Sequence, residues 1–196
     1  NSSAASDVYK RQIRKARYGK DIKEDDIQRY HFIIYAIKDM LRNPDNPSYI
    51  YPRKEAAAQC TELLKEYVTR LYRKNKNKCL GFILEYSKDL ESAFFSLKEI
   101  ITYAKKKDEI SVLLDKLFLL GRLANFYPLL ISCWIRFKDN ENKIKEVLRL
   151  IEVFIFRVYA ICKRPVYTGR SRLYDLAHKV HTKQLNLSLI HISEPT

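Results

Sequence analysis

Few residues of this chain have the types and spacing that catalysis or metal binding would need. His178 and His181 are three residues apart, a spacing that can place two metal ligands on one face of a helix. No third ligand is evident nearby, so we expect no metal site here. The alternative to a metal site is a pair of exposed histidines on a basic helix. His31 lies among aromatic and apolar residues, which favours a packed histidine over a catalytic base. Carboxylates such as Glu109 and Asp115 fit the solvated face of a helix better than an acid–base pair.

Other motifs that would indicate an enzyme are not found. The sequence holds neither a glycine-rich phosphate loop nor the strand-to-helix turn of a hydrolase nucleophile. The four cysteines are far apart and lie in apolar helical patterns: Cys60, Cys79, Cys133 and Cys162. This placement predicts buried free thiols in a reducing compartment rather than disulfides or a zinc site. We therefore predict a cytoplasmic chain without catalytic residues or a metal of its own.

Clusters of basic residues are more informative. The 37 Lys and Arg residues outnumber the 23 Asp and Glu residues, and the formal net charge of +14 favours polyanionic partners. A first cluster brackets one predicted loop and fits solvated surface as well as phosphate contact: Arg70, Arg73, Lys74, Lys76 and Lys78. A second cluster is interleaved with Tyr167 and Tyr174 and opposed only by Asp175. Its members, for which we predict contact with DNA phosphates, are Lys163, Arg164, Arg170, Arg172 and Lys179, with Lys183 beyond them.

Membrane attachment is a weaker explanation of the basicity. The longest apolar stretch, near residues 126–135, is about half as long as a membrane-spanning helix requires. The apolar stripes of the predicted helices resemble core faces rather than the interfacial face of a membrane-bound helix. We expect no membrane partner.

The apolar residues that must position these groups recur at helical spacing and predict an all-α, multi-helix bundle of about six to eight helices. Only four glycines are present, and no Asn-Gly or Asp-Gly pair signals a hairpin. The predicted helices cover residues 21–41, 52–71, one stretch formed by 80–86 and 90–104, 110–120, 128–137 and 142–162, followed by one that Ser171 could cap. Residues 73–78 are predicted as a basic connector. Pro128 should begin one helix, and Gly169 should bound the loop before the last.

The helix over residues 142–162 has the clearest apolar stripe, and extra apolar residues on its other faces predict that its second half is buried nearly all round. Arg157 lies within that second half. A buried arginine needs a carboxylate, carbonyl groups or an aromatic face as its partner. We therefore predict a structural role for Arg157.

Both ends of the chain have an unusual character. Residues 2–12 resemble the translation of a transposase sequencing adapter, and residues 187–196 resemble the translation of its partner adapter. We therefore set 1–12 and 187–196 apart and expect a helical domain over 13–186, an internal fragment of a larger protein such as metagenomic sequencing yields. The net charge of +14 survives this trimming, because the two ends carry one net charge each, of opposite sign.

One segment resembles a known family. It contains Phe-Tyr-Pro-Leu-Leu-Ile at 126–131, Leu-Ile-Glu-Val-Phe-Ile-Phe-Arg-Val-Tyr at 150–159, Lys-Arg at 163–164 and Thr-Gly-Arg-Ser-Arg-Leu-Tyr-Asp-Leu-Ala at 168–177. This pattern is similar to the helical middle region of GmrSD-type restriction endonucleases. The resemblance extends over about residues 110–181 and is looser upstream.

The resemblance implies a parent enzyme that cleaves foreign, often base-modified DNA in phage defence. In that family a ParB-like nucleotidase domain precedes the helical region and an HNH-type nuclease domain follows it, so the implied cofactors are a nucleoside triphosphate and a divalent metal. The family's nucleotidase motif would lie upstream of Ile13 and its nuclease motif beyond Asn186, and His178 and His181 do not match the latter. The implied partners are DNA and the two flanking domains of the same chain. The alternative is a non-catalytic helical module that binds nucleic acid or another protein.

Overall fold

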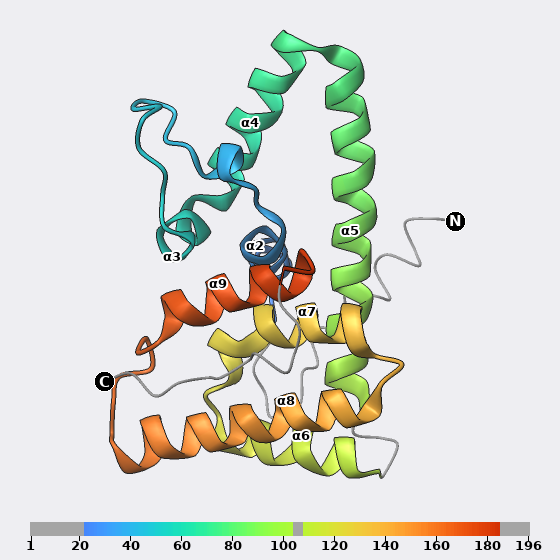
Figure 1. Cartoon of the computed structure of the whole chain (residues 1–196), viewed down its shortest axis with the longest axis vertical. Helices are drawn as coiled ribbons and strands as arrows, with labels where there is room; N and C mark the ends of the chain where they lie inside the picture. The colour runs from blue at the N-terminus through green and yellow to red at the C-terminus, as the bar shows by residue number, and fades with distance from the viewer. Residues whose placement is uncertain (1–21, 104–107, 185–196) are drawn as a thin grey trace.

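The structure is a computed structural model that describes residues 22–103 and 108–184. The described residues form helices joined by short connections, and the one β-type contact among them is an isolated antiparallel bridge between Arg42 and Ile50. The predicted all-α, multi-helix fold is confirmed (Figure 1). The two predicted adapter segments, 1–12 and 187–196, lie outside the described residues.

The helices follow one another closely along the chain. They are α2 (Glu24–Tyr35), α3 (Arg53–Ala56), α4 (Cys60–Lys74), α5 (Lys76–Thr102), α6 (Glu109–Leu120), α7 (Tyr127–Phe137), α8 (Glu141–Phe154) and α9 (Arg170–His181). Short 3₁₀ turns occupy Lys38–Leu41, Ala57–Gln59 and Leu123–Phe126, and a π-helix, Ile155–Ile161, continues α8. Among the described residues no helix combines the length and apolarity that a membrane span requires.

Helix α7 lies at the centre of the main core. Nine of its 11 residues are buried, so it has no polar face to turn toward water. Helices α9, α5, α2 and α8 pack around it, and α6 lies side by side with α8 (Figure 1). The sequence correctly predicts the start of α7, because Pro128 lies in its first turn, where a missing N–H is harmless.

Helices α4 and α5 form a hairpin that extends away from this core (Figure 1). The predicted basic connector over 73–78 is wrong, because only Asn75 separates the two helices. The Oδ1 atom of Asn75 accepts a hydrogen bond of 2.9 Å from the backbone N–H of Lys78 and so caps the start of α5. Lysine is a good helix former, so the charged stretch continues into α5, which also contains the single helical stretch predicted over 80–86 and 90–104.

The first helix ends earlier than its apolar spacing predicts. Helix α2 stops at Tyr35, and the guanidinium of Arg53 donates hydrogen bonds to the carbonyl oxygens of Ile33, at 3.0 Å, and Ala36, at 2.9 Å. These are carbonyl groups of the kind that a helix end leaves without intrahelical partners. Ile37, predicted as part of the stripe, is consequently exposed.

The helix with the clearest stripe also differs from its prediction. Helix α8 buries one face against α6 and α7, but its π-helical continuation leaves Phe156 and Arg157 exposed. The predicted burial of Arg157 is therefore wrong, because the π-helical segment leaves this side chain on the solvent side of the chain. Cys162, at the end of the same segment, is likewise exposed, whereas the other three cysteines are buried free thiols as predicted.

Gly169 bounds the connection before α9 for a steric reason. It takes the N-cap position of α9, which corrects the expectation that Ser171 would cap this helix. Its φ of +77° lies in the left-handed region, and a Cβ atom here would lie 3.1 Å from Cζ of Phe154. A Cβ atom at Gly81, in the second turn of α5, would meet no atom within 4 Å.

Alanine substitutions at these two glycines should change the free energy of unfolding in opposite directions. We expect Gly169→Ala to lower the free energy of unfolding by about 1–3 kcal/mol, through backbone strain and contact with Phe154. Gly81→Ala should raise it by about 0.5–1 kcal/mol, because alanine is the better helix former at an uncrowded position. Urea titrations followed by circular dichroism measure both changes, and a shift of the same sign in both variants would contradict this account.

Candidate nucleic-acid interface

The connection between α8 and α9 carries the first two residues of the second basic cluster, Lys163 and Arg164, and is held by buried polar contacts. The hydroxyl of Tyr159 lies 3.1 Å from the carbonyl oxygens of both Val166 and Thr168 and shares its proton between them. Asn125 donates a further hydrogen bond to the carbonyl of Val166, and the guanidinium of Arg122 lies over the Tyr159 ring. Burial raises the pKa of Tyr159, so its hydroxyl remains a donor at neutral pH. The connection is therefore fixed to the core.

The π-helix ends in a turn that exposes two cations to solvent. Lys163 has a φ of +50°, a left-handed conformation that strains a residue other than glycine by about 1 kcal/mol. The N–H of Arg164 bonds to the carbonyl of Val158 at 3.0 Å and closes this turn. Both Lys163 and Arg164 are exposed, as the prediction of phosphate contact requires.

Helix α9 separates its charged residues from its apolar ones. Its buried residues are Leu173, Tyr174, Ala177 and Val180. Arg172 and Lys179 are exposed, and their spacing of seven residues places them on one face. Asp175 lies on the same side, and its Oδ1 atom is 3.6 Å from Nε of Arg53, so an arginine already partners this carboxylate.

The predicted site residues do not all share one environment. Lys163, Arg164, Arg172 and Lys179 are exposed, and we call these four the basic corner. Arg170 is half-buried, and its charge acts on Tyr159 and Tyr174, so it serves packing more than solvent contact. Tyr174 is buried, which corrects the picture of two tyrosines interleaved with the cations. Tyr167 is 58% exposed, as a tyrosine interleaved with the cations should be.

The first basic cluster lies at the tip of the α4–α5 hairpin, and all five of its members are exposed. Arg70 uses its Nη2 atom to donate to the carbonyl of Asp39 at 2.9 Å. The ammonium of Lys76 lies over the ring of Tyr72, 5.4 Å from its centroid. Two of the five cations therefore have contacts within the chain, as expected of an ordinary solvated surface.

A buried His–Asp–His cluster fastens α9 to α2 and α5. The Nε2 atoms of His31 and His181 lie 2.9 and 3.1 Å from Oδ1 of Asp89. Burial alone would raise the pKa of Asp89, but the hydrogen bonds and charge of the two histidines outweigh it and hold that pKa well below its usual range. The prediction that His31 is a packed histidine is confirmed, and the alternative of an exposed His181 is wrong, since its side chain is 8% exposed.

His178 serves packing as well. Its Nδ1 atom lies 2.8 Å from the carbonyl oxygen of Ile34 and donates to it. Burial, aided by the nearby charge of Arg53, lowers the pKa of His178 to about 4, so the ring is neutral at pH 7. His178 and His181 thus have separate partners, and the described residues contain no group of three or more potential ligands that could hold a metal ion.

The sequence reasoning missed two residues that position α9. The sequence contains a sign of the role of Asp89, because this residue interrupts the apolar stripe of Tyr86, Ala93 and Leu97 on the buried side of α5. No sequence pattern indicates the role of Arg53, since its partners on α2 and α9 are distant in the sequence. It is Arg53, rather than Arg157, that fills the role of the buried arginine.

Together the fold and the site define an all-α protein with an exposed basic corner fixed on a buried core. Comparisons of the chain with protein-family models, with curated proteins and with solved structures found no match. The similarity to the helical region of GmrSD-type enzymes therefore stays a prediction.

The contacts of Arg53 predict a large loss of stability when it is replaced. We expect Arg53→Met to lower the free energy of unfolding by about 3 kcal/mol, because it strands the carbonyls of Ile33 and Ala36 and leaves Asp175 unpaired. The exposed neighbour Lys54 gives a matched control, and Lys54→Met should change stability by less than about 0.5 kcal/mol. Urea titration at pH 7 measures both, and equal effects would refute the structural role of Arg53.

The environment of His178 predicts acid sensitivity. As the pH falls from about 6.5 to about 4, the unfolded chain takes up a proton at this position before the folded chain does. The folded state should therefore lose on the order of 2 kcal/mol across this window through His178. In the His178→Gln variant the difference in unfolding free energy between pH 7 and pH 4.5 should be clearly smaller. An unchanged difference would assign the acid sensitivity to other groups.

Proposed function

We propose that this chain is a DNA-binding helical connector of a modification-dependent, nucleotide-using restriction endonuclease whose catalytic residues belong to flanking domains. The observation that carries the proposal is the basic corner, with two exposed cations on a connection that buried hydrogen bonds fix to the core and two more on the exposed face of α9. The similarity over residues 110–181 supplies the identity of the parent enzyme.

The charge of the basic corner fits a phosphate backbone. Lysine and arginine bind DNA by neutralising phosphates and releasing condensed counterions, a gain that does not depend on base sequence. Four exposed cations in this region face one carboxylate, Asp175, and Arg53 already partners it. The corner therefore keeps most of its positive charge for an outside partner.

The fixed position of the corner suits a connector. Side chains on rigid elements meet a partner without the loss of loop entropy that flexible segments suffer on binding. Tyr159, Asn125 and Gly169 hold the connection against the core, and the His–Asp–His cluster holds α9. A connector built this way would keep DNA in register with the domains on either side.

A second candidate is a module that binds a protein, such as a neighbouring domain of the same chain. Large apolar side chains are exposed on the π-helix and the connection, close in sequence to the basic corner: Phe156, Ile161, Val166 and Tyr167. Exposed apolar patches of this kind mark interaction sites. Salt dependence separates the two candidates, because phosphate contacts weaken with salt and apolar contacts do not.

Binding to a fluorescent DNA duplex, followed by anisotropy at several salt concentrations, tests the proposal. We expect salt-sensitive binding that falls by at least about tenfold when all four residues of the basic corner become Gln, with a shallower dependence on salt. The matched control replaces four other exposed lysines with Gln: Lys54, Lys65, Lys88 and Lys116. Equal losses in the two variants would reduce the effect to net charge and contradict the proposed interface.

The connector role has its own test in the full-length gene. A nucleotidase motif should lie upstream of this segment and a histidine–asparagine nuclease motif downstream. A gene with neither motif would overturn the connector role while leaving DNA binding to be judged by the anisotropy experiment.

A further inference from the structure

The side of α5 opposite its buried residues carries one regular row of exposed side chains. This row, which we call the α5 row, has spacings of four, three and four residues and consists of Leu84, Lys88, Glu91 and Phe95. Such spacing keeps side chains on one face of a helix, as in the seam of a coiled coil. Leu84 is 56% exposed and Phe95 is 49% exposed, so each end of the row presents a large apolar side chain to water.

The middle of the α5 row carries two opposite charges that the chain does not use. Lys88 and Glu91 are both exposed, and among the residues that the structure describes neither side chain takes part in an ion pair or a hydrogen bond. Other carboxylates on helix surfaces do have cationic partners, as Glu109 has in Lys145 and Glu152 has in Lys116. The charges of Lys88 and Glu91 are therefore available to a partner outside the chain.

The α5 row is complementary to itself when two copies of the helix run antiparallel. Across a two-fold axis, every contact from one residue to another is accompanied by the reverse contact. If Lys88 lies opposite the partner's Glu91, then Glu91 lies opposite the partner's Lys88. Because the helices run in opposite directions, four residues back along one corresponds to four residues forward along the other, and Leu84 meets the partner's Phe95. The seam then has two ion pairs at its centre and an apolar pair at each end.

Other registers lack this match. A shift of seven residues in one direction places Leu84 opposite Lys88, which sets a charge against an apolar side chain. The same shift in the other direction places Lys88 opposite Lys98, which brings like charges together. Parallel helices in register would set each charge of the row against its own copy. The order of charges along α5 therefore selects one antiparallel register.

We propose that this chain forms a homodimer through the α5 row, with two antiparallel copies of α5 related by a two-fold axis. The two contacts between Leu84 and Phe95 bury apolar area that the single chain exposes. The two contacts between Lys88 and Glu91 fix the register, although exposed ion pairs add little affinity. A seam of this size belongs to the class of small, weak interfaces. The proposal does not depend on DNA binding.

Sedimentation equilibrium of the whole chain, at concentrations up to about 200 µM, tests the proposal. We expect the average mass to rise with concentration from 23.3 kDa toward twice that value. Lys88→Glu alone, or Glu91→Lys alone, sets like charges opposite each other twice and should weaken association at least about tenfold. In an equimolar mixture of these two variants every charge of the seam again meets its opposite, so association should return. A wild-type chain that stays monomeric, or a mixture that does not associate, would overturn the proposal.

Matched variants elsewhere on the surface control for net charge and for exposed apolar area. Glu62→Lys and Lys65→Glu change two exposed residues of α4 that have the same spacing of three, and neither should alter association. Leu84→Glu should abolish the dimer, whereas Leu119→Glu, at an exposed leucine of α6, should leave it intact. Circular dichroism verifies that each variant is folded. Equal losses in the α5 row and in the controls would show that this face does not hold the dimer and would contradict the proposal.

Discussion

The near-complete burial of α7 is the constraint on which the rest of the structure depends. A helix with nine buried residues out of 11 gains its stability only if other elements cover every side of it. Helices α2, α5, α8 and α9 provide that cover, although they come from both halves of the chain. Helix α9 must consequently lie across α7 and against α2, and this arrangement brings polar residues of distant segments into the interior.

Those polar residues fix how the helices meet. Buried polar groups destabilise a fold unless they are paired, and here the pairs join different helices. Arg53 bonds the end of α2 and contacts Asp175 on α9, His178 bonds Ile34, and Asp89 joins His31 to His181. The apolar core thus sets the overall arrangement, and the polar pairs select one orientation of α9 within it.

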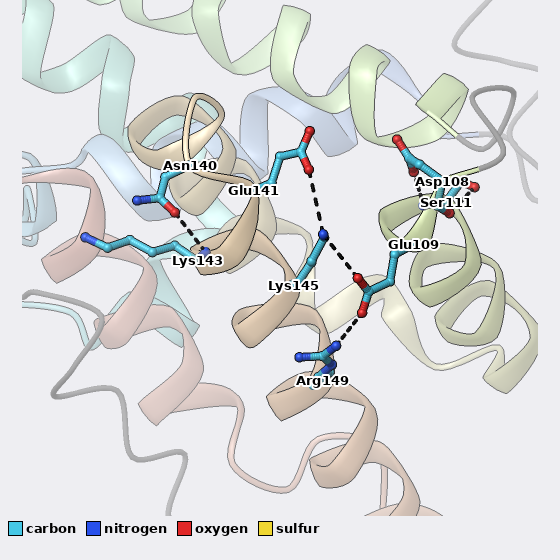
Figure 2. A network of polar contacts seen from close by, with 8 residues as sticks. All are labelled: Asp108, Glu109, Ser111, Asn140, Glu141, Lys143, Lys145 and Arg149. Atoms are coloured by element: carbon cyan, nitrogen blue, oxygen red, sulfur yellow. Dashed lines mark hydrogen bonds and ion pairs between the residues drawn. The ribbon is translucent and has the colours of Figure 1, made fainter.

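Helix α8 ends in a π-helical segment that leads to the basic corner. The connection after it is fixed, because the hydroxyl of Tyr159 bonds two of its carbonyl oxygens. At the other end of α8, Asn140 caps the helix, and the ammonium of Lys145 lies between Glu109 and Glu141 and so ties the start of α8 to the start of α6 (Figure 2).

The sequence by itself determined the all-α class, the start of α7 at Pro128, the end of α6 at Gly121 and the cations of the basic corner, because these depend on local spacing and local backbone preference. It did not determine the partners of the histidines, the role of Arg53 or the exposure of Arg157. Helical periodicity reports which face of a helix is apolar but not which element covers it. The partners of His31 and His178 lie 58 and 144 residues away, so only the packing of α2 against α5 and α9 could bring them together.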